Sequence, residues 1–192
     1  MIKIATAECF THGLIAQEIH ALAQGYEGEF GCKYFNDVNY FNNSGNPYKL
    51  SENALKNMSV VCGVFVPTVS SLKNILKIDA PKPSKIIKDI KVYDENQDKY
   101  VAELMANAIM TISKADIGIG TTAGIGRGGI AISTKEFTVI TTSGFYADLS
   151  DPSSSQLLKR QTKGVEKALD IFMCILNDDL GRIMEYDDVY CR

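Results

Sequence analysis

The sequence predicts an α/β fold, with a mixed, mostly parallel sheet and helices on both faces. Three observations lead to this prediction. Short β-branched apolar runs alternate along the chain with stretches whose apolar residues recur at helical spacing. The 192 residues are 45% hydrophobic and 22% charged, which is typical of a globular protein with a core of its own. No internal repeat or long linker divides them, so we expect a single α/β domain over residues 1–192.

The first elements are a strand and a helix. Residues 2–7 are a short apolar and β-branched run, and residues 11–24 then switch to helical spacing. Residues 26–49 are rich in Tyr, Phe, Asn and Gly without clean periodicity, which indicates edge strands and loops. Residues 59–66 form a continuous apolar run, typical of a strand covered on both faces, and Pro67 ends it.

A weak helix is expected over residues 69–78, followed by a surface loop at residues 80–84. The clearest amphipathic helix spans residues 95–114. Its apolar positions follow an i, i+3, i+4, i+7 pattern, namely Val101, Leu104, Met105, Ala108, Ile109 and Ile112.

The last third of the chain predicts a strand, a glycine-rich loop, a hairpin and a helix. Residues 117–120 are the strand, and the loop through Gly129 leads to hairpin strands at residues 130–132 and 137–140. Asp151-Pro152-Ser153 then signals the start of a long helix. The apolar stripe of that helix contains Leu158, Val165, Leu169, Phe172 and Leu176.

Charge and composition exclude several classes of function. Lys and Arg number 20 against 23 Asp and Glu, so the net charge is −3 without a basic stripe, and nucleic-acid binding is not expected. No apolar run approaches the roughly 20 residues of a membrane span, and no signal peptide is recognisable, so we expect a cytoplasmic protein without membrane contact. Five cysteines without a C-x-x-C pair, and only two histidines, predict reduced thiols and no metal site.

The first strand-to-helix turn carries the strongest chemical signal, because it places Cys9 at the carboxyl end of a predicted inner strand. Free N–H groups at a helix N-terminus favour a thiolate, which is the nucleophilic form, and can hold an oxyanion. A protonated His12 would add to this effect, whereas Glu8 would oppose it or bind a ligand donor. Two other interpretations remain open: Cys9 as a small apolar filler and His12 as a polar helix cap.

Residues 118–129 contain six glycines in twelve positions. Glycines allow close backbone approach, as an anion-binding cradle of N–H groups requires, although tight turns between strands explain them as well. The segment is neither a P-loop nor a Rossmann fingerprint. Its candidate ligand-binding residues are Gly120, Thr121, Thr122, Gly124, Gly126, Arg127 and Gly128.

Both segments resemble the C-terminal domain family of competence-damage-inducible (CinA) proteins, the nicotinamide mononucleotide amidohydrolases, over about the first 145 residues. The turn at residues 8–13 is similar to that family's Glu-Ser-Cys-Thr-Gly-Gly turn, and Thr121-Thr122-Ala123-Gly124 to its Thr-Gly-Ile-Ala-Gly-Pro loop. The resemblance implies a CinA C-terminal-like fold, with the nucleophilic serine of the family falling on Cys9. Tyr40-Phe41-Asn42-Asn43 places Asn where the family has the Lys of Tyr-x-x-Lys.

The whole chain resembles more closely the HcgF-type proteins of methanogenic archaea, which act in assembly of the iron-guanylylpyridinol (FeGP) cofactor of Fe-hydrogenase. The resemblance is carried by Ala-Glu-Cys-Phe-Thr-His-Gly at residues 7–13 and Thr-Thr-Ala-Gly-Ile-Gly-Arg-Gly-Gly at residues 121–129. It implies that an E1-like partner enzyme adenylates the carboxyl group of guanylylpyridinol. Cys9 then captures this group as a thioester, poised for transfer to iron.

Chemical reasoning agrees, because a thioester keeps more of the activation of an adenylate than an oxygen ester does. We therefore expect a catalytic group of Cys9, Thr11 and His12, with Glu8, Phe10 and Gly13 at the ligand. Guanylylpyridinol is the expected ligand, and no cofactor stays bound. The glycine-rich segment and the aromatic residues at 34–43, Tyr40 among them, are the candidates for the nucleotide site.

Three functions remain open at this stage. The first is the thioester-forming protein, the second a hydrolase of nucleotide amides or phosphates, and the third a nucleotide-binding or scaffold module in which Cys9 is inert. The apolar C-terminal helix and the aromatic segment leave room for a homodimer.

Overall fold

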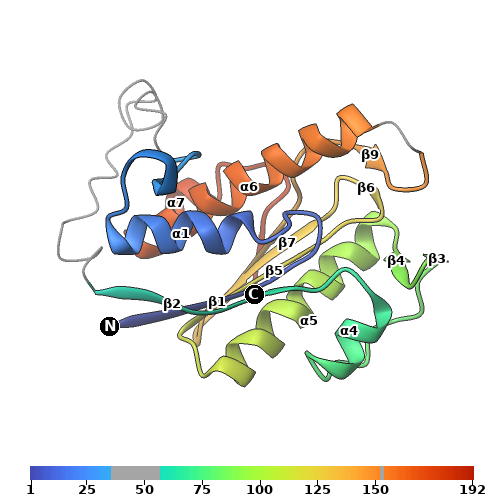
Figure 1. The fold of residues 1–192 in the computed structure, drawn as a ribbon, viewed down its shortest axis with the longest axis horizontal. Helices are drawn as coiled ribbons and strands as arrows, with labels where there is room; N and C mark the ends of the chain where they lie inside the picture. Colours follow the sequence, from blue (N-terminus) through green and yellow to red (C-terminus); the bar gives the residue numbers. More distant parts are fainter. Residues whose placement is uncertain (36–56, 152–153) are drawn as a thin grey trace.

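The computed structural model describes residues 1–35, 57–151 and 154–192. Its main sheet has six strands in the order β10-β8-β7-β5-β1-β2 (Figure 1). These are β1 (Ile2–Glu8), β2 (Met58–Phe65), β5 (Ile117–Thr122), β7 (Gly129–Ser133), β8 (Thr138–Thr141) and β10 (Tyr190–Cys191). β1 runs parallel to both β2 and β5, whereas the pairs β5–β7, β7–β8 and β8–β10 are antiparallel. Four strands, β2, β1, β5 and β8, therefore point the same way, and the predicted mixed α/β fold is confirmed.

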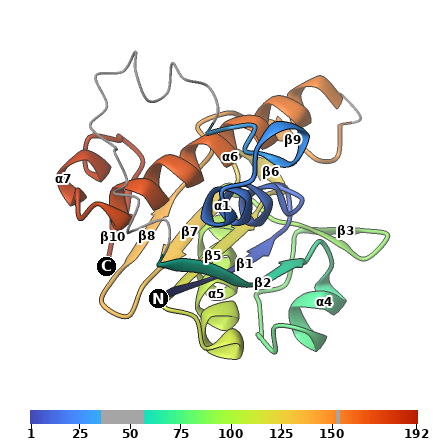
Figure 2. The same cartoon turned by 60° about the vertical axis from the view of Figure 1, so that its left-hand side comes forward.

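Helices cover both faces of this sheet, as Figures 1 and 2 show. One face carries α1 (Leu14–Gln24) and α6 (Ser154–Leu176), and the short α7 (Leu180–Ile183) follows α6. The other face carries α5 (Glu95–Ser113) and α4 (Val69–Asn74). In the part of the chain that the structure describes, no helix is long and apolar enough to cross a membrane.

The remaining elements are short. A 3-10 turn, η1 (Gly28–Phe30), follows α1. β3 (Lys85–Ile87) pairs with β4 (Ile90–Val92), and β6 (Ile125–Gly126) pairs with β9 (Ala147–Asp148). The sequence predicted none of these pairs, because two or three residues are too few to show a hydrophobic period.

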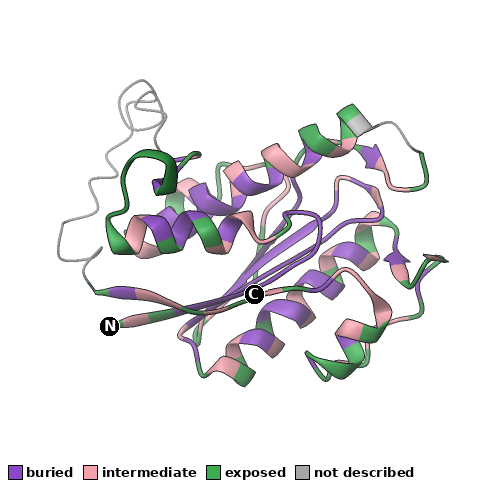
Figure 3. Ribbon diagram, in the orientation of Figure 1, coloured by how far each residue is buried: buried purple, intermediate pink, exposed green. Residues whose placement is uncertain are grey.

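Glycines in β5 explain how closely α5 packs on the sheet. A Cβ atom at Gly118 would lie 2.2 Å from the carbonyl oxygen of Ala106, and one at Gly120 would lie 2.1 Å from that of Ala102. Both contacts are shorter than atoms allow, so only glycine fits beneath the helix. Figure 3 shows the matching buried stripe along α5. Gly120 therefore lies in the strand that the sequence predicted, and this candidate ligand residue is packed beneath a helix.

The main difference from the sequence prediction concerns β2. Its continuous apolar run predicted a strand covered on both faces, but β2 lies at one edge of the sheet. Val61 and Phe65 remain 43% and 51% exposed. The apolar run was misleading because it shows that a segment prefers a sheet but does not show where in the sheet the strand lies.

Candidate functional site

A cavity of about 350 Å³ opens at the carboxyl ends of the parallel strands β1, β2 and β5. This edge is where ligands bind in open α/β sheets. The residues that line the cavity are mostly apolar. They are Phe10, Phe65, Pro67, Ile90, Ala123, Leu149, Leu157 and Leu158, together with Cys9, His12, Arg160 and Gln161.

Cys9 lies in the wall of this cavity and is 7% exposed. Its amide nitrogen donates to the carbonyl oxygen of Thr121 at 2.9 Å and is 3.2 Å from the Thr121 hydroxyl. The Thr11 hydroxyl lies 2.7 Å from the same Thr121 hydroxyl. These bonds attach the turn after β1 to the end of β5. Thr11 and Thr121 are fully buried, so they position the turn and do not face the cavity.

Glu8 accepts hydrogen bonds from N–H groups at the start of α1 that the sequence analysis expected to stabilise a Cys9 thiolate. Its fully buried carboxylate accepts hydrogen bonds from the amides of Ile15 at 3.2 Å and Ala16 at 2.8 Å, and from the hydroxyls of Thr11 and Thr6. The other two initial amides of α1 donate to carbonyl oxygens of the turn, Leu14 to Thr11 and Gln17 to Gly13. The expectation that the N-terminal amides of α1 hold an oxyanion at Cys9 is therefore wrong.

The amides of Phe10 and Thr11 are the closest N–H groups along the chain after Cys9, and neither has a hydrogen-bond partner among the described residues. His12 and Gly13 follow in left-handed conformation, with φ of 54° and 84°. This reverses the chain into α1 and leaves Gly13 at the helix cap, outside the cavity lining.

Phe10 and His12 form part of the cavity wall. The Phe10 ring packs on Gly164 of α6, where a Cβ atom would lie 2.4 Å from the ring. The Phe10 carbonyl accepts a bond from Gln161 Nε2 at 3.0 Å. The exposed His12 ring meets Phe65 edge to face, with 5.2 Å between the centroids. Phe10 and His12 thus lie where the sequence analysis expected them, beside the thiol.

Arg160 is a cavity residue that the sequence analysis missed. It is 2% exposed, and its Nη1 donates to the carbonyl oxygens of Gly124 and Gly126 at 3.0 Å and of Ala147 at 2.8 Å. One sequence signal was available. Arg160 precedes Gly164 by four residues and therefore falls in phase with the buried stripe of α6.

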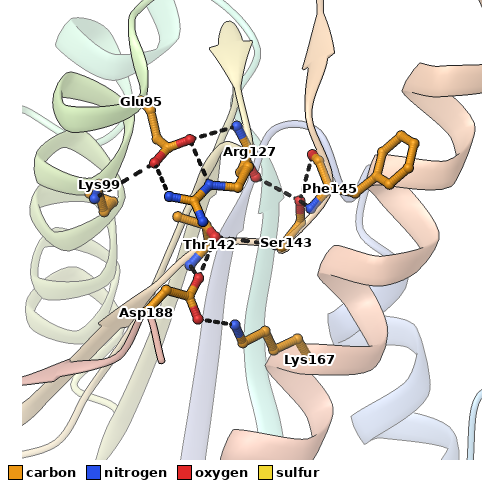
Figure 4. Close-up of polar contacts among 9 residues, drawn as sticks. Glu95, Lys99, Arg127, Thr142, Ser143, Phe145, Lys167 and Asp188 are labelled. Atoms are coloured by element: carbon orange, nitrogen blue, oxygen red, sulfur yellow. Dashed lines mark hydrogen bonds and ion pairs between the residues drawn. The ribbon is translucent and has the colours of Figure 1, made fainter. Parts of the chain in front are cut away.

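The glycine-rich segment is not assembled around the cavity, since Ala123 alone of residues 118–129 lines it. Gly124 approaches β4 closely, and a Cβ atom there would lie 2.4 Å from the Tyr93 amide nitrogen. Arg127, expected to bind a phosphate, makes a two-pronged ion pair with Glu95 at 2.9 and 2.7 Å (Figure 4).

Other candidate residues have structural surroundings as well. Gly126 and Gly128 have positive φ angles, 123° and 70°, which fit tight turns. Thr122 is buried, and its hydroxyl interacts with the Asp98 carboxyl, whose pKa it lowers. Tyr40 lies outside the residues that the structure describes.

Two further ionisable side chains are buried in this region, Asp98 and Lys91. Burial raises the pKa of Asp98 to about 7, although the Gly124 amide and the charges of Arg160 and Lys91 act to lower it. Asp98 Oδ2 accepts the Gly124 amide at 2.7 Å, and an interaction with the Thr122 hydroxyl also lowers the pKa of this carboxyl. Lys91 is 1% exposed and donates to the Val66 carbonyl at 2.7 Å.

The other thiols have different surroundings. Cys32 and Cys174 pack in the main hydrophobic core. Burial, together with the charge of Glu18, raises the pKa of Cys32 to about 11, which disfavours its thiolate at neutral pH. Burial also raises the pKa of Cys191. Across residues 1–35, 57–151 and 154–192, no three His, Cys, Asp or Glu side chains gather as a metal site would require.

The C-terminal segment holds the opposite edge of the sheet. Asp188 accepts hydrogen bonds from Thr142 and from Lys167 (Figure 4). Tyr190 of β10 pairs with Ile140 of β8. This network lies on the side of Arg127 and β8, and none of its residues lines the Cys9 cavity.

Comparison with known proteins identifies relatives over nearly the full length. The model of the family "FeGP cofactor biosynthesis protein HcgF" matches residues 1–176. A UPF0254 protein of Methanothermobacter thermautotrophicus (strain Winter) is 42% identical over 178 residues, covering 93% of this chain and 98% of that protein. A UPF0254 protein of Methanopyrus kandleri is 39% identical, covering 96% of this chain and 93% of the relative. One from Methanococcus maripaludis (strain C5) is 36% identical, covering 94% and 99%.

Proposed function

The chain belongs to the HcgF family of FeGP cofactor biosynthesis proteins, and from this premise we propose that Cys9 captures the activated carboxyl group of guanylylpyridinol as a thioester. The observation that carries the proposal is the position of Cys9 in the wall of an apolar cavity at the ligand-binding edge of the sheet. A thiol used only as filler has no need of such a cavity.

The cavity volume of about 350 Å³ lies near the lower end for small-molecule sites. We therefore assign it to the pyridinol ring and its carboxyl group, with Phe10 and Phe65 against the ring. The guanylyl part extends beyond the cavity. The glycine-rich segment supplies only Ala123 to this space, so the nucleotide contacts lie elsewhere on the protein.

The reaction exchanges one acyl bond for another. An E1-like enzyme first forms the acyl adenylate, in which the carboxyl carbon is bonded to a phosphate oxygen of AMP. The Cys9 thiolate attacks this carbon, the carbon–oxygen bond breaks, and AMP leaves with the electron pair. The thiol proton passes to solvent, or to His12 at the mouth of the cavity. The amides of Phe10 and Thr11 are available to bind the oxyanion that forms during the attack.

Mass spectrometry tests the proposal. The protein is incubated with guanylylpyridinol, ATP and the adenylating enzyme, and its peptides are mapped without reducing agent. We expect the Cys9 peptide to gain the mass of guanylylpyridinol less one water, and hydroxylamine to remove it. Cys62→Ser, which alters a half-buried thiol that does not line the cavity, is the matched control and should retain the adduct.

Two results would contradict the thioester. One is an unmodified Cys9 peptide in a mixture where the acyl adenylate has accumulated. The other is steady release of a hydrolysis product that is lost in Cys9→Ala, since this indicates the hydrolase that the sequence analysis left open.

A further inference from the structure

Arg160 has unused hydrogen-bonding capacity in the cavity wall. All three of its hydrogen bonds to described residues come from Nη1, which donates to carbonyl oxygens of Gly124, Gly126 and Ala147. Nε is buried without a partner, and Nη2 has no hydrogen bond among the described residues. A guanidinium carries five N–H donors, and buried ones are normally bonded. One edge of this group is therefore free for a ligand.

The positive charge of Arg160 is only partly balanced. Burial lowers the pKa of Arg160, while electrostatic interactions with Asp98, Cys9 and Asp148 act against that effect. Asp98 does not neutralise it fully at neutral pH, because burial raises the pKa of Asp98 to about 7. A cation that is only partly balanced thus lies within electrostatic range of the Cys9 side chain.

The surroundings strengthen any contact that this cation makes with an anion. The cavity is lined mainly by aliphatic and aromatic side chains, so water screens charges poorly there. The Phe10 ring lies beneath the guanidinium, with 5.8 Å between Arg160 Cζ and the ring centroid. This contact and the three carbonyl bonds hold the guanidinium plane in place, and a fixed guanidinium edge matches the two oxygens of a carboxylate or phosphate.

We infer that Arg160 is the anion-binding and specificity-determining residue of this cavity. Its free edge binds a negatively charged carboxylate or acyl-phosphate group beside the Cys9 sulfur, so the site selects anionic acyl compounds over neutral ones. The identity of that ligand rests on the proposed function. The preference for an anion rests on the cavity and on Arg160 alone.

Two alkylating reagents of similar size but different charge test this inference. Iodoacetate is an anion and iodoacetamide is neutral, and both react with thiolates. The rate at which iodoacetate alkylates Cys9 is divided by the rate for iodoacetamide, and both rates are measured by peptide mass spectrometry. This ratio is then divided by the same ratio for an unfolded peptide containing Cys9, which removes the effects of thiol reactivity. The measurement is made at pH 7, where Asp98 is only partly ionised and an ordinary imidazole is mostly neutral. We expect a normalised ratio well above one for the unaltered protein.

Variants then assign the preference to one side chain. Arg160→Gln should lower the normalised ratio about tenfold or more, as expected for loss of a bond between charged groups. Arg160→Lys keeps the charge without the planar edge and should give an intermediate ratio. Lys159→Gln is the matched control, because it removes a neighbouring positive charge that lies outside the cavity, against the Phe145 ring, and it should leave the ratio unchanged.

A normalised ratio of one or less in the unaltered protein would overturn the inference, whether or not the variants fold. So would a ratio that Arg160→Gln leaves unchanged. If Arg160 were merely structural, Arg160→Gln would change the rates of both reagents equally and leave their ratio unaltered. The outcome is also separable from the proposed function: anion preference without a thioester adduct contradicts only the thioester, and an adduct without anion preference contradicts only this role of Arg160.

Discussion

The buried carboxyl of Asp98 predicts an unusual dependence of stability on pH. Burial raises its pKa from 3.8 to about 7 in the folded protein, whereas the unfolded chain keeps the ordinary value. Asp98→Asn removes the ionisation and preserves an oxygen that can accept the Gly124 amide. The variant therefore isolates the cost of ionising this side chain in its buried position.

The magnitude follows from the two pKa values. Well below pH 3.8 the carboxyl is protonated in both states and contributes no pH dependence. Between the two pKa values the folded protein holds a proton that the unfolded chain has lost, so stability falls as the pH rises. The interval from 3.8 to about 7, at about 1.4 kcal/mol per pH unit, amounts to about 4 kcal/mol.

Urea denaturation followed by circular dichroism between pH 4 and pH 8 measures the effect. We expect Asp98→Asn to exceed the unaltered protein in stability by less than about 1 kcal/mol at pH 4 and by up to about 4 kcal/mol at pH 8. Asp116→Asn is the control, because the hydrogen bond from Lys135 lowers the pKa of the Asp116 carboxyl. Removing that carboxyl should therefore destabilise the folded protein at pH 8 relative to pH 4, opposite to the effect of Asp98→Asn. Parallel curves for the unaltered protein and Asp98→Asn would refute the reasoning.

Three further substitutions give distinct expectations. Gly164→Ala places a methyl carbon 2.4 Å from the Phe10 ring and should cost about 1–3 kcal/mol in urea denaturation; an unchanged midpoint would contradict that packing. Glu8→Gln leaves buried donors unsatisfied and should cost about 2–3 kcal/mol, with faster amide exchange in the first turn of α1; normal protection there would argue against the cap. Arg127→Ala breaks a partly exposed ion pair with Glu95 and should cost less than about 1 kcal/mol of stability. It should leave the thioester yield unchanged, and a lower yield would indicate that Arg127 binds the ligand.

Local patterns predicted most of the fold. The helix over residues 95–114, the long helix with its apolar stripe from Leu158 to Leu176, and the hairpin that became β7 and β8 depend on neighbours in the chain, and all three are confirmed. The edge position of β2 depends on which strands pair across long separations, so its apolar run could not reveal it.

The site was predictable at its centre but not around it. Cys9 was recognisable as a candidate because it follows a predicted inner strand, and α/β proteins bind ligands at the carboxyl ends of such strands. The function of a glycine, by contrast, depends on what lies opposite it. Gly120 and Gly124 face backbone of α5 and β4, whereas the sequence suggested a phosphate. Arg160 reaches the cavity from a helix far along the chain, and only the tertiary structure places it beside the thiol.

The most direct test of the account is a crystal structure of the unaltered protein after reaction with adenylated guanylylpyridinol. The account predicts continuous electron density from the Cys9 sulfur to the acyl carbon, with the pyridinol ring against Phe10 and Phe65. Guanylylpyridinol bound at another surface, with its carboxyl carbon out of reach of this sulfur, would contradict it.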